Sequence, residues 1–209
     1  MPYPITLLMT MKPLILASSS PYRRELLSRL QLPFQAVAPN LDETPLMGET
    51  AMDTCARLSL AKAQKVAESH PKALIIGSDQ VALLNGRLVG KPGTHEVAQQ
   101  QLRQASGREM SFHTALCLLN ASTGVAQQTR VDAQVRYRTL TDDEIERYLQ
   151  ADKPYDCAGS AKSEGMGITL LEYIRSDDPT ALIGLPLIAL SGLLRDAGFT
   201  IPATKSRSQ

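Results

Sequence analysis

Residues Leu14–Leu27 read LILASSSPYRRELL, and the order of residue types in this stretch decides the fold class. The apolar run Leu14–Ala17 predicts a buried strand. Ser20 and Pro21 follow it, and these residue types favour the N-cap and the first position of a helix. The leucines after them give that helix one apolar face. A strand that turns directly into a helix indicates an α/β domain.

Beyond this unit, short apolar runs alternate with amphipathic stretches along the chain. Further strands are expected at 34–38, 73–76, 81–84, 87–89, 111–119, 126–138 and 167–174. Further helices are expected at 50–69, 94–105, 142–149 and 186–197. Asn85-Gly86 is a strong signal for a two-residue hairpin, and Thr141 with Glu144 fits a capping box. We expect one mixed α/β domain over residues 11–201, with a loose extension at 1–10 and a frayed tail at 202–209.

The overall charge of the chain argues against a polyanionic partner. Its 209 residues carry 22 Lys and Arg against 21 Asp and Glu, a formal charge of +1, and only 4% of them are aromatic. Such a balance leaves no broad basic field to collect nucleic acid or an anionic membrane. No apolar run reaches the roughly 18–20 residues of a membrane span. We expect a protein that binds neither nucleic acid nor membrane, with any anion site built locally.

Cysteine and histidine usage indicates a reduced, cytoplasmic environment. The three cysteines, Cys55, Cys117 and Cys157, form no CxxC pair, and the three histidines are scattered. A zinc cluster and a disulfide scaffold are therefore disfavoured, and we expect buried, reduced thiols. The apolar stretch near the N-terminus has no cationic region before it, so we do not expect it to be a signal peptide.

The usual nucleotide-binding and hydrolase fingerprints are missing. Gly86–Pro92 (GRLVGKP) has one residue too few between its glycines for a P-loop, and its proline stands where Ser or Thr would bind magnesium. Gly165-Met166-Gly167 lacks the third glycine of a dinucleotide loop, and neither GxSxG nor HExxH occurs. Kinases, dehydrogenases and hydrolases of the usual kinds are thereby disfavoured.

The turn between the first expected strand and helix has the chemistry of an anion site. Its serine hydroxyls and the free N–H groups of the helix N-terminus face one point. Arg23 and Arg24 lie in the first helical turn, where the helix macrodipole disfavours cations unless an anion is bound. Taken alone, these residues are explained equally well by Ser20 as a helix cap and by two solvated arginines.

Other charged residues are individually uninformative. Glu43 lies in an acidic turn beside a proline. Asp79 follows a predicted strand, at a sheet edge where ligands bind or where an Asx-turn would form. Without further context, the side chains of Lys62, Lys91 and Glu164 would be solvated. Only the order of these residues along the chain is specific.

That order resembles the Maf family of nucleoside triphosphate pyrophosphatases over residues 12–198. The matching segments are LILASSSPYRRELL (14–27), DET (42–44), Lys62, IIGSDQ (75–80), GKP (90–92) and GSAKSEGMGITL (159–170). The resemblance implies hydrolysis between the α- and β-phosphates to a nucleoside monophosphate and pyrophosphate, as house-cleaning of modified nucleotides. It also implies a divalent metal cation (magnesium or manganese), a homodimer, and a single elongated domain with a central mixed β-sheet flanked by helices, the Maf/ITPase-like fold.

The same resemblance implies roles for individual residues. Asp79 matches the family's proposed proton acceptor. The family's polar pocket is matched by Ser18, Ser20, Arg23, Glu43, Lys62 and Lys91. We expect Glu43 and Asp79 to hold the metal, and Asp79 to take the proton of the attacking water. The two serines and Arg23 would cradle the phosphates, while Lys62 and Lys91 would stabilise the departing pyrophosphate.

Three positions bear on the choice of base. The branch that acts on dTTP and UTP typically has Arg, Thr and Gln at the positions of Tyr22, Gln80 and Glu164. This chain is similar instead to the branch assigned to 7-methyl-GTP, although that branch often has Trp at the position of Tyr22. N7-methylation makes guanine cationic, so the ring of Tyr22 would gain roughly 0.5–2 kcal/mol of cation–π attraction. Glu164 can accept hydrogen bonds from guanine's N1–H and amino group and offset its charge.

Two alternatives stay open on the sequence. The enzyme could act on dTTP, UTP or another modified nucleotide. The same phosphate cradle could instead serve a regulator that binds triphosphates without hydrolysing them. Against the regulator, two carboxylates beside a polyphosphate are unfavourable without a metal.

Overall fold

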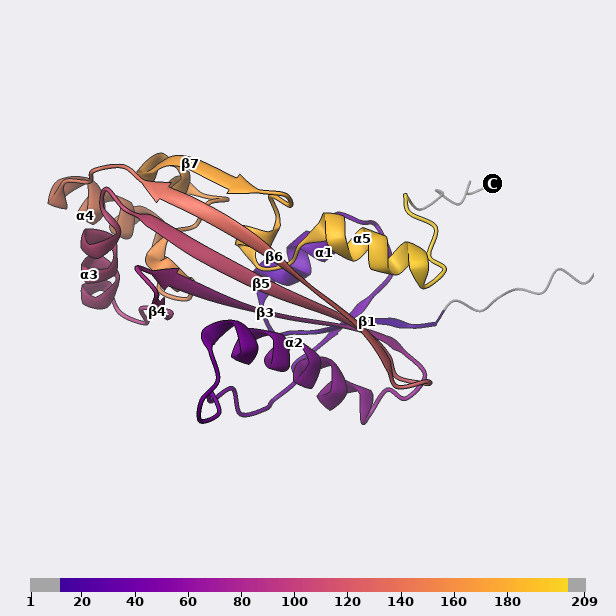
Figure 1. Ribbon diagram of the computed structural model, residues 1–209. Coiled ribbons are helices and arrows are strands. Elements are labelled where there is room, and N and C mark those ends of the chain that lie inside the picture. The colour runs from indigo at the N-terminus through magenta and orange to yellow at the C-terminus, as the bar shows by residue number, and fades with distance from the viewer. Residues whose placement is uncertain (1–11, 203–209) are drawn as a thin grey trace, which may run out of the picture.

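The computed structural model describes residues 12–202, whose seven strands form one mixed sheet in the order β2-β1-β3-β5-β6-β7, with β4 paired to β3 (Figure 1). The strands are β1 Leu14–Ala17, β2 Gln35–Val37, β3 Leu74–Leu84, β4 Arg87–Val89, β5 Glu109–Asn120, β6 Val125–Tyr137 and β7 Leu171–Ser176. The helices are α1 Pro21–Ser28, α2 Ala51–Ala67, α3 His95–Ala105, α4 Asp142–Asp152 and α5 Leu187–Asp196. Short 3₁₀ turns cover Ala158–Ser160, Met166–Leu170 and Ala181–Ile183.

The long strands give the domain its elongated shape. Strand β1 pairs in parallel with β2 and β3, and all other pairs are antiparallel. Helices α1 and α5 cover one face of the sheet at one end, and α2 covers the opposite face, while α3 and α4 gather at the far end (Figure 1). This arrangement confirms the expected single elongated domain with a central mixed β-sheet flanked by helices.

Alternation along β1 explains why helices cover both faces of the sheet. Leu14 and Leu16 pack with leucines of α1 and α5 in one core cluster. Ile15 and Ala17 point to the opposite face and pack with Ala63 of α2. Successive side chains of a strand point to opposite faces, so a strand that is apolar throughout must be covered on both. A third cluster, between the far end of the sheet and α3 and α4, completes the core.

Local signals in the sequence placed most helix starts and the hairpin correctly. The Ser20 side chain caps α1 by accepting from the backbone N–H of Arg23. Capping boxes begin α2 and α4, the latter formed by Thr141 and Glu144. The Asn85-Gly86 turn joins β3 to β4, with positive φ at both residues.

The expectation that a strand ends at Ile76 is wrong. Strand β3 is continuous from Leu74 to Leu84, so Asp79 lies inside the strand and not after it. The reason is that β1 pairs with β3 only as far as Ile76, whereas β5 supplies hydrogen-bonding partners along the whole of β3. Asp79 therefore lies just beyond the end of β1, beside the turn that leads into α1.

The expected strand 167–174 is also corrected. Its first residues form the 3₁₀ turn Met166–Leu170, and β7 begins at Leu171. Gly167 packs so closely on the Lys162 backbone that a Cβ at this position would lie 2.5 Å from the carbonyl oxygen of Lys162.

The predicted extension at 1–10 and most of the predicted tail at 202–209 lie outside the described residues. Over residues 12–202, no helix combines the length and the apolar character that crossing a membrane requires.

Candidate active site

One cavity of about 570 Å³ is lined by all the residues to which the family resemblance assigns a role. Its lining includes Ser18, Ser20, Tyr22, Arg23, Glu43, Lys62, Asp79, Gln80, Lys91 and Glu164. These side chains come from the turn before α1, from α1 itself, from the loop after β2, from α2 and β3, and from two later loops. The cavity has two ends. We call Ser18, Ser20, Arg23, Glu43, Lys62 and Asp79 the polar end, and Tyr22, Asp156, Cys157 and Glu164 the aromatic end.

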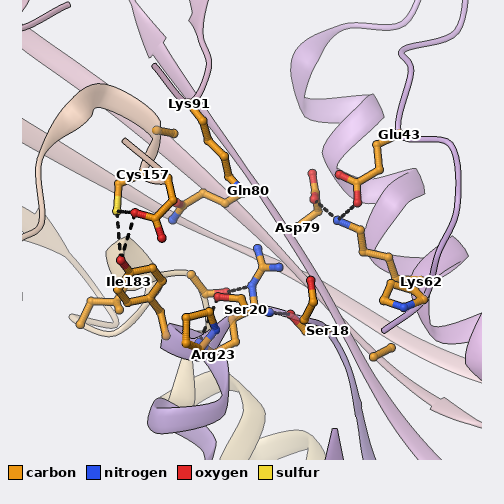
Figure 2. A pocket seen from close by; sticks show the side chains of 18 of the residues that line it. Ser18, Ser20, Arg23, Glu43, Lys62, Asp79, Gln80, Lys91, Cys157 and Ile183 are labelled. Carbon is orange, nitrogen blue, oxygen red and sulfur yellow. Dashed lines mark hydrogen bonds and ion pairs between the residues drawn. The ribbon is translucent and has the colours of Figure 1, made fainter. Parts of the chain in front are cut away.

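Lys62 lies between two carboxylates at the polar end. Its Nζ is 2.6 Å from Oδ1 of Asp79 and 3.0 Å from Oε1 of Glu43 (Figure 2). The side chains of Lys62 and Asp79 are only 6% and 10% exposed, whereas that of Glu43 is 54% exposed. The ammonium group thus offsets part of the charge of two carboxylates that would otherwise repel each other.

A glycine in β3 makes this contact possible. A Cβ at Gly77 would overlap the backbone carbonyl of Ser59, because α2 packs directly on β3 at this point. Only glycine allows such a close approach. Lys62 is three residues beyond Ser59 on α2 and Asp79 is two beyond Gly77 on β3, so the close approach brings their side chains together.

The turn into α1 is shaped by its own serines. Ser18 Oγ accepts from the backbone N–H of Ser20 at 3.1 Å, and Ser20 Oγ accepts from that of Arg23 at 3.4 Å. These N–H groups are therefore occupied, but both hydroxyls line the cavity and, among the described residues, neither has an acceptor for its own hydrogen, so both can donate to an anion. Arg24 is exposed and does not line the cavity.

The side chain of Arg23 is held in place by a backbone carbonyl group at the cavity wall. Its Nε donates to the carbonyl oxygen of Gly184 at 2.8 Å, and among the described residues no acceptor binds its terminal nitrogens. Figure 2 shows its guanidinium group in the space between Ser20 and Asp79. Burial lowers the pKa of Arg23, and the charge of Asp79 opposes that shift most strongly. A partly desolvated guanidinium with free donors is suited to an anionic ligand.

Gln80 makes contacts that the sequence did not reveal. Its Nε2 donates to Thr114 Oγ1 at 2.9 Å and to the carbonyl oxygens of Ala181 and Leu182 at 2.8 and 3.1 Å. Nearby, Ser78 Oγ donates to the carbonyl oxygen of Gly184 at 3.0 Å. The Gln80 amide therefore holds the 3₁₀ turn that forms one wall of the cavity, and its role in base choice stays a prediction.

The aromatic end is built from Tyr22 and a loop after α4. The Tyr22 hydroxyl donates to Asp156 Oδ1 at 3.2 Å and lies 3.7 Å from Sγ of Cys157. Burial is the largest cause that raises the pKa of Tyr22, and the contacts with Cys157 and Asp156 raise it further. The hydroxyl therefore keeps its proton and remains a donor. Glu164 and Lys91 are exposed side chains that line the same cavity.

The sequence did not indicate that Asp156 and Cys157 line the site. Asp156 stands in a Pro-Tyr-Asp turn that matches no catalytic or ligand-binding motif. Cys55 and Cys117 are buried as expected, but Cys157 is only half-buried and lines the cavity, which corrects the expectation for that thiol. Burial is the main cause that raises the pKa of Cys157 to about 12, so it stays a neutral thiol.

The polar end offers two carboxylates as possible ligands for a metal ion. Residues 12–202 contain no group of three or more His, Cys, Asp or Glu side chains arranged to hold a metal ion. Glu43 and Asp79 nevertheless both contact the ammonium group of Lys62 through one oxygen each, and the second oxygen of each carboxylate is not part of that ion pair. Magnesium commonly binds through one or two carboxylates, with substrate phosphates and water as the other ligands. The residues present fit such a shared site.

Comparisons with known proteins agree with the fold and with the motif order. A family model described as "Maf-like protein" matches residues 13–197. A "7-methyl-GTP pyrophosphatase" of Cupriavidus pinatubonensis is 60% identical over 186 residues, which cover 89% of this chain and 94% of the relative. A relative of the same name in Thiobacillus denitrificans is 58% identical over 194 residues, 91% of this chain and 96% of that one.

Two solved structures share the fold at low sequence identity. The HAM1 protein of Coxiella burnetii superposes with a TM-score of 0.51 at 14% identity, over 89% of this chain and all (100%) of the other. The Ham1 protein of Staphylococcus aureus gives a TM-score of 0.50 at 12% identity over the same shares of the two chains. These likenesses concern the arrangement of strands and helices.

Proposed function

The chain belongs to the Maf-like protein family, and we propose that it hydrolyses 7-methyl-GTP between the α- and β-phosphates to 7-methyl-GMP and pyrophosphate. The observation that carries this proposal is the cavity itself. One continuous space joins a polar end suited to phosphates with an aromatic end that holds Tyr22 and Glu164. Such an enzyme would remove modified nucleotides from the cellular pool.

The polar end supplies positioning and charge for phosphoanhydride hydrolysis. The hydroxyls of Ser18 and Ser20, together with the terminal nitrogens of Arg23, would bind the phosphate oxygens. A water molecule attacks the α-phosphorus, the bond to the bridging oxygen breaks, and pyrophosphate leaves. Lys62 and Lys91 would offset the charge that builds up on the leaving group.

Asp79 is the proposed base in this reaction. Its carboxylate lies in the cavity just past the end of β1, facing the phosphate cradle. It takes the proton that the attacking water loses as the new bond to phosphorus forms. Lys62, 2.6 Å away, fixes the orientation of that carboxylate and ties it to Glu43. In this assignment Lys62 positions the carboxylates and also contributes positive charge near the phosphates.

We propose magnesium or manganese as the metal that Glu43 and Asp79 hold together with the substrate. When bound, a divalent cation supplies charge neutralisation and polarisation of phosphate oxygens. The proposal is supported by two carboxylates that share one ammonium group beside the proposed phosphate site.

We further propose, from family membership, a cytoplasmic homodimer with no nucleic-acid or membrane partner. Sedimentation velocity tests the dimer, and a single species of one chain's mass would contradict it.

The aromatic end would bind the base. The face of Tyr22 is suited to stack on a cationic purine, with roughly 0.5–2 kcal/mol from the cation–π interaction. Glu164 offers two acceptor oxygens to the N1–H and amino group of guanine. A pyrimidine does not present that pair of donors, so dTTP and UTP would be weaker substrates.

Pyrophosphate release from 7-methyl-GTP, GTP, dTTP and UTP, each with magnesium or manganese, tests the function. Fastest release from 7-methyl-GTP is expected. Preference for dTTP or UTP would keep the hydrolytic assignment and overturn the choice of base. Release from none of them, together with measurable triphosphate binding by calorimetry, would show a nucleotide-binding regulator in place of an enzyme.

A further inference from the structure

The carboxylate of Asp156 contacts the hydroxyl group of Tyr22, whose ring the proposed function assigns to base stacking. Asp156 Oδ1 accepts the Tyr22 hydroxyl at 3.2 Å, and Cys157 Sγ lies 3.5 Å from the same oxygen. Figure 2 shows Cys157 on the opposite side of the cavity from Asp79, Glu43 and Lys62. Asp156 is therefore placed at the aromatic end and away from the groups that would handle the phosphates.

The turn that carries Asp156 is held by backbone contacts on both sides. The N–H of Cys157 donates to the carbonyl oxygen of Pro154 at 3.3 Å, and that of Gly93 donates to the carbonyl oxygen of Tyr155 at 3.0 Å. The Tyr155 hydroxyl is also 3.0 Å from Nδ1 of His95 at the start of α3. These contacts hold the backbone of the turn, and the carboxylate of Asp156 itself contacts the Tyr22 hydroxyl and the Cys157 thiol.

The carboxylates at the aromatic end differ from those at the polar end in their ion pairing. Over residues 12–202, Asp156 and Glu164 form no ion pair, whereas Glu43 and Asp79 share Lys62. The ammonium group of Lys162 lies 5.9 Å from the Tyr22 ring centre and donates to the Asp152 carbonyl oxygen. Lys162 does not line the cavity.

We propose that Asp156 is a specificity-determining residue that orients Tyr22 through its hydroxyl and adds a second unpaired carboxylate to the base subsite, so that the site selects a positively charged nucleobase. This inference rests on the proposed function. It assigns to the turn after α4 a share of the selectivity that the sequence attributes to Tyr22, Gln80 and Glu164. The physical basis is the attraction between a carboxylate and a cationic ring that bind at the same end of the cavity.

Two substitutions separate the charge of Asp156 from its hydrogen bond. Asp156→Asn keeps an acceptor for the Tyr22 hydroxyl and removes the charge, whereas Tyr22→Phe removes the hydrogen bond and keeps both the charge and the ring. Asp143→Asn, on the exposed start of α4, is the control for loss of one negative charge. The quantity compared is kcat/KM for 7-methyl-GTP divided by kcat/KM for GTP, whose base is neutral.

Asp156→Asn is expected to lower this ratio about tenfold, equivalent to about 1.4 kcal/mol. Tyr22→Phe should raise KM for both nucleotides and change the ratio less, and Asp143→Asn should change neither. If the wild-type enzyme prefers 7-methyl-GTP and the kcat/KM ratio of Asp156→Asn lies within twofold of the wild-type ratio, this inference alone is overturned. A wild-type enzyme with no preference would overturn the proposed function and this inference with it. If Asp156→Asn has no turnover, calorimetric binding of 7-methyl-GMP against GMP decides by the same ratio.

Discussion

At the polar end of the cavity, Lys62 and Asp79 stand on α2 and β3 and are 6% and 10% exposed, whereas Asp156 and Glu164 at the aromatic end stand on loops and are exposed. The first pair is built into the packing of a helix on a sheet. The second pair depends on turns held by a few backbone hydrogen bonds. A change at the polar end should therefore affect turnover and folding together, while a change at the aromatic end should affect mainly the choice of substrate.

The largest effect is expected from Asp79→Asn. Asparagine has nearly the same shape and can still accept from Lys62, but it cannot take a proton from water. Loss of a general base commonly costs about 10²–10⁴-fold in rate, so kcat should fall by that order. Pyrophosphate release and a thermal melt measure turnover and folding, with Asp196→Asn at the end of α5 as the control. Turnover near that of the wild type would remove Asp79 from the role of base.

Gly77→Ala tests whether the polar end depends on helix–sheet packing. The new Cβ would overlap the Ser59 carbonyl, so α2 must shift away from β3 and carry Lys62 away from Asp79. Overpacking of this kind costs about 1–3 kcal/mol in the free energy of unfolding, and a small displacement of a catalytic group can cost about 10²-fold in rate. Both the melting temperature and kcat should fall.

The control for Gly77→Ala is a second glycine-to-alanine change in the same chain. At Gly192, in α5, an added Cβ meets nothing within 4 Å. Alanine is the better helix former by about 0.8–1.0 kcal/mol, so Gly192→Ala should leave the melting temperature unchanged or raise it. If both variants behave alike, the close approach of α2 to β3 does not set the geometry of Lys62 and Asp79.

The sequence predicted the two ends of the cavity unequally, for physical reasons. The helix start near Ser20 and Arg23 has a local signature that is compatible with an anion site, and the order of motifs then assigned Ser18, Ser20 and Arg23 to the phosphates. The pairing of Lys62 with Asp79 was not predicted, because it depends on a contact between α2 and β3, and no local pattern in either element indicates it. Gly77 and Ser78 looked like the end of a strand, yet β5 continues the ladder past them.

At the aromatic end, Tyr22 and Glu164 were predicted only from the order of motifs. The contact between Tyr22 and Asp156 joins residues 134 positions apart, and no pattern within either segment indicates it. The same holds for Gln80, whose amide holds a turn about a hundred residues later in the chain. Long-range hydrogen bonds between polar loop residues have no periodicity, so a single sequence does not reveal them.

The smallest effect on the enzyme as a whole is expected from Glu164→Gln, which should leave folding unchanged and alter selectivity. Glutamine keeps one acceptor oxygen but loses the charge and offers a donor where guanine also has donors. The ratio of kcat/KM for 7-methyl-GTP to that for UTP should therefore fall about tenfold, the equivalent of roughly one charge-assisted hydrogen bond. Glu68→Gln, an exposed change beyond the end of α2, is the control. If Glu164→Gln lowers turnover of both nucleotides equally, the aromatic end acts in the chemical step as the polar end does, and the division between the two ends would be wrong.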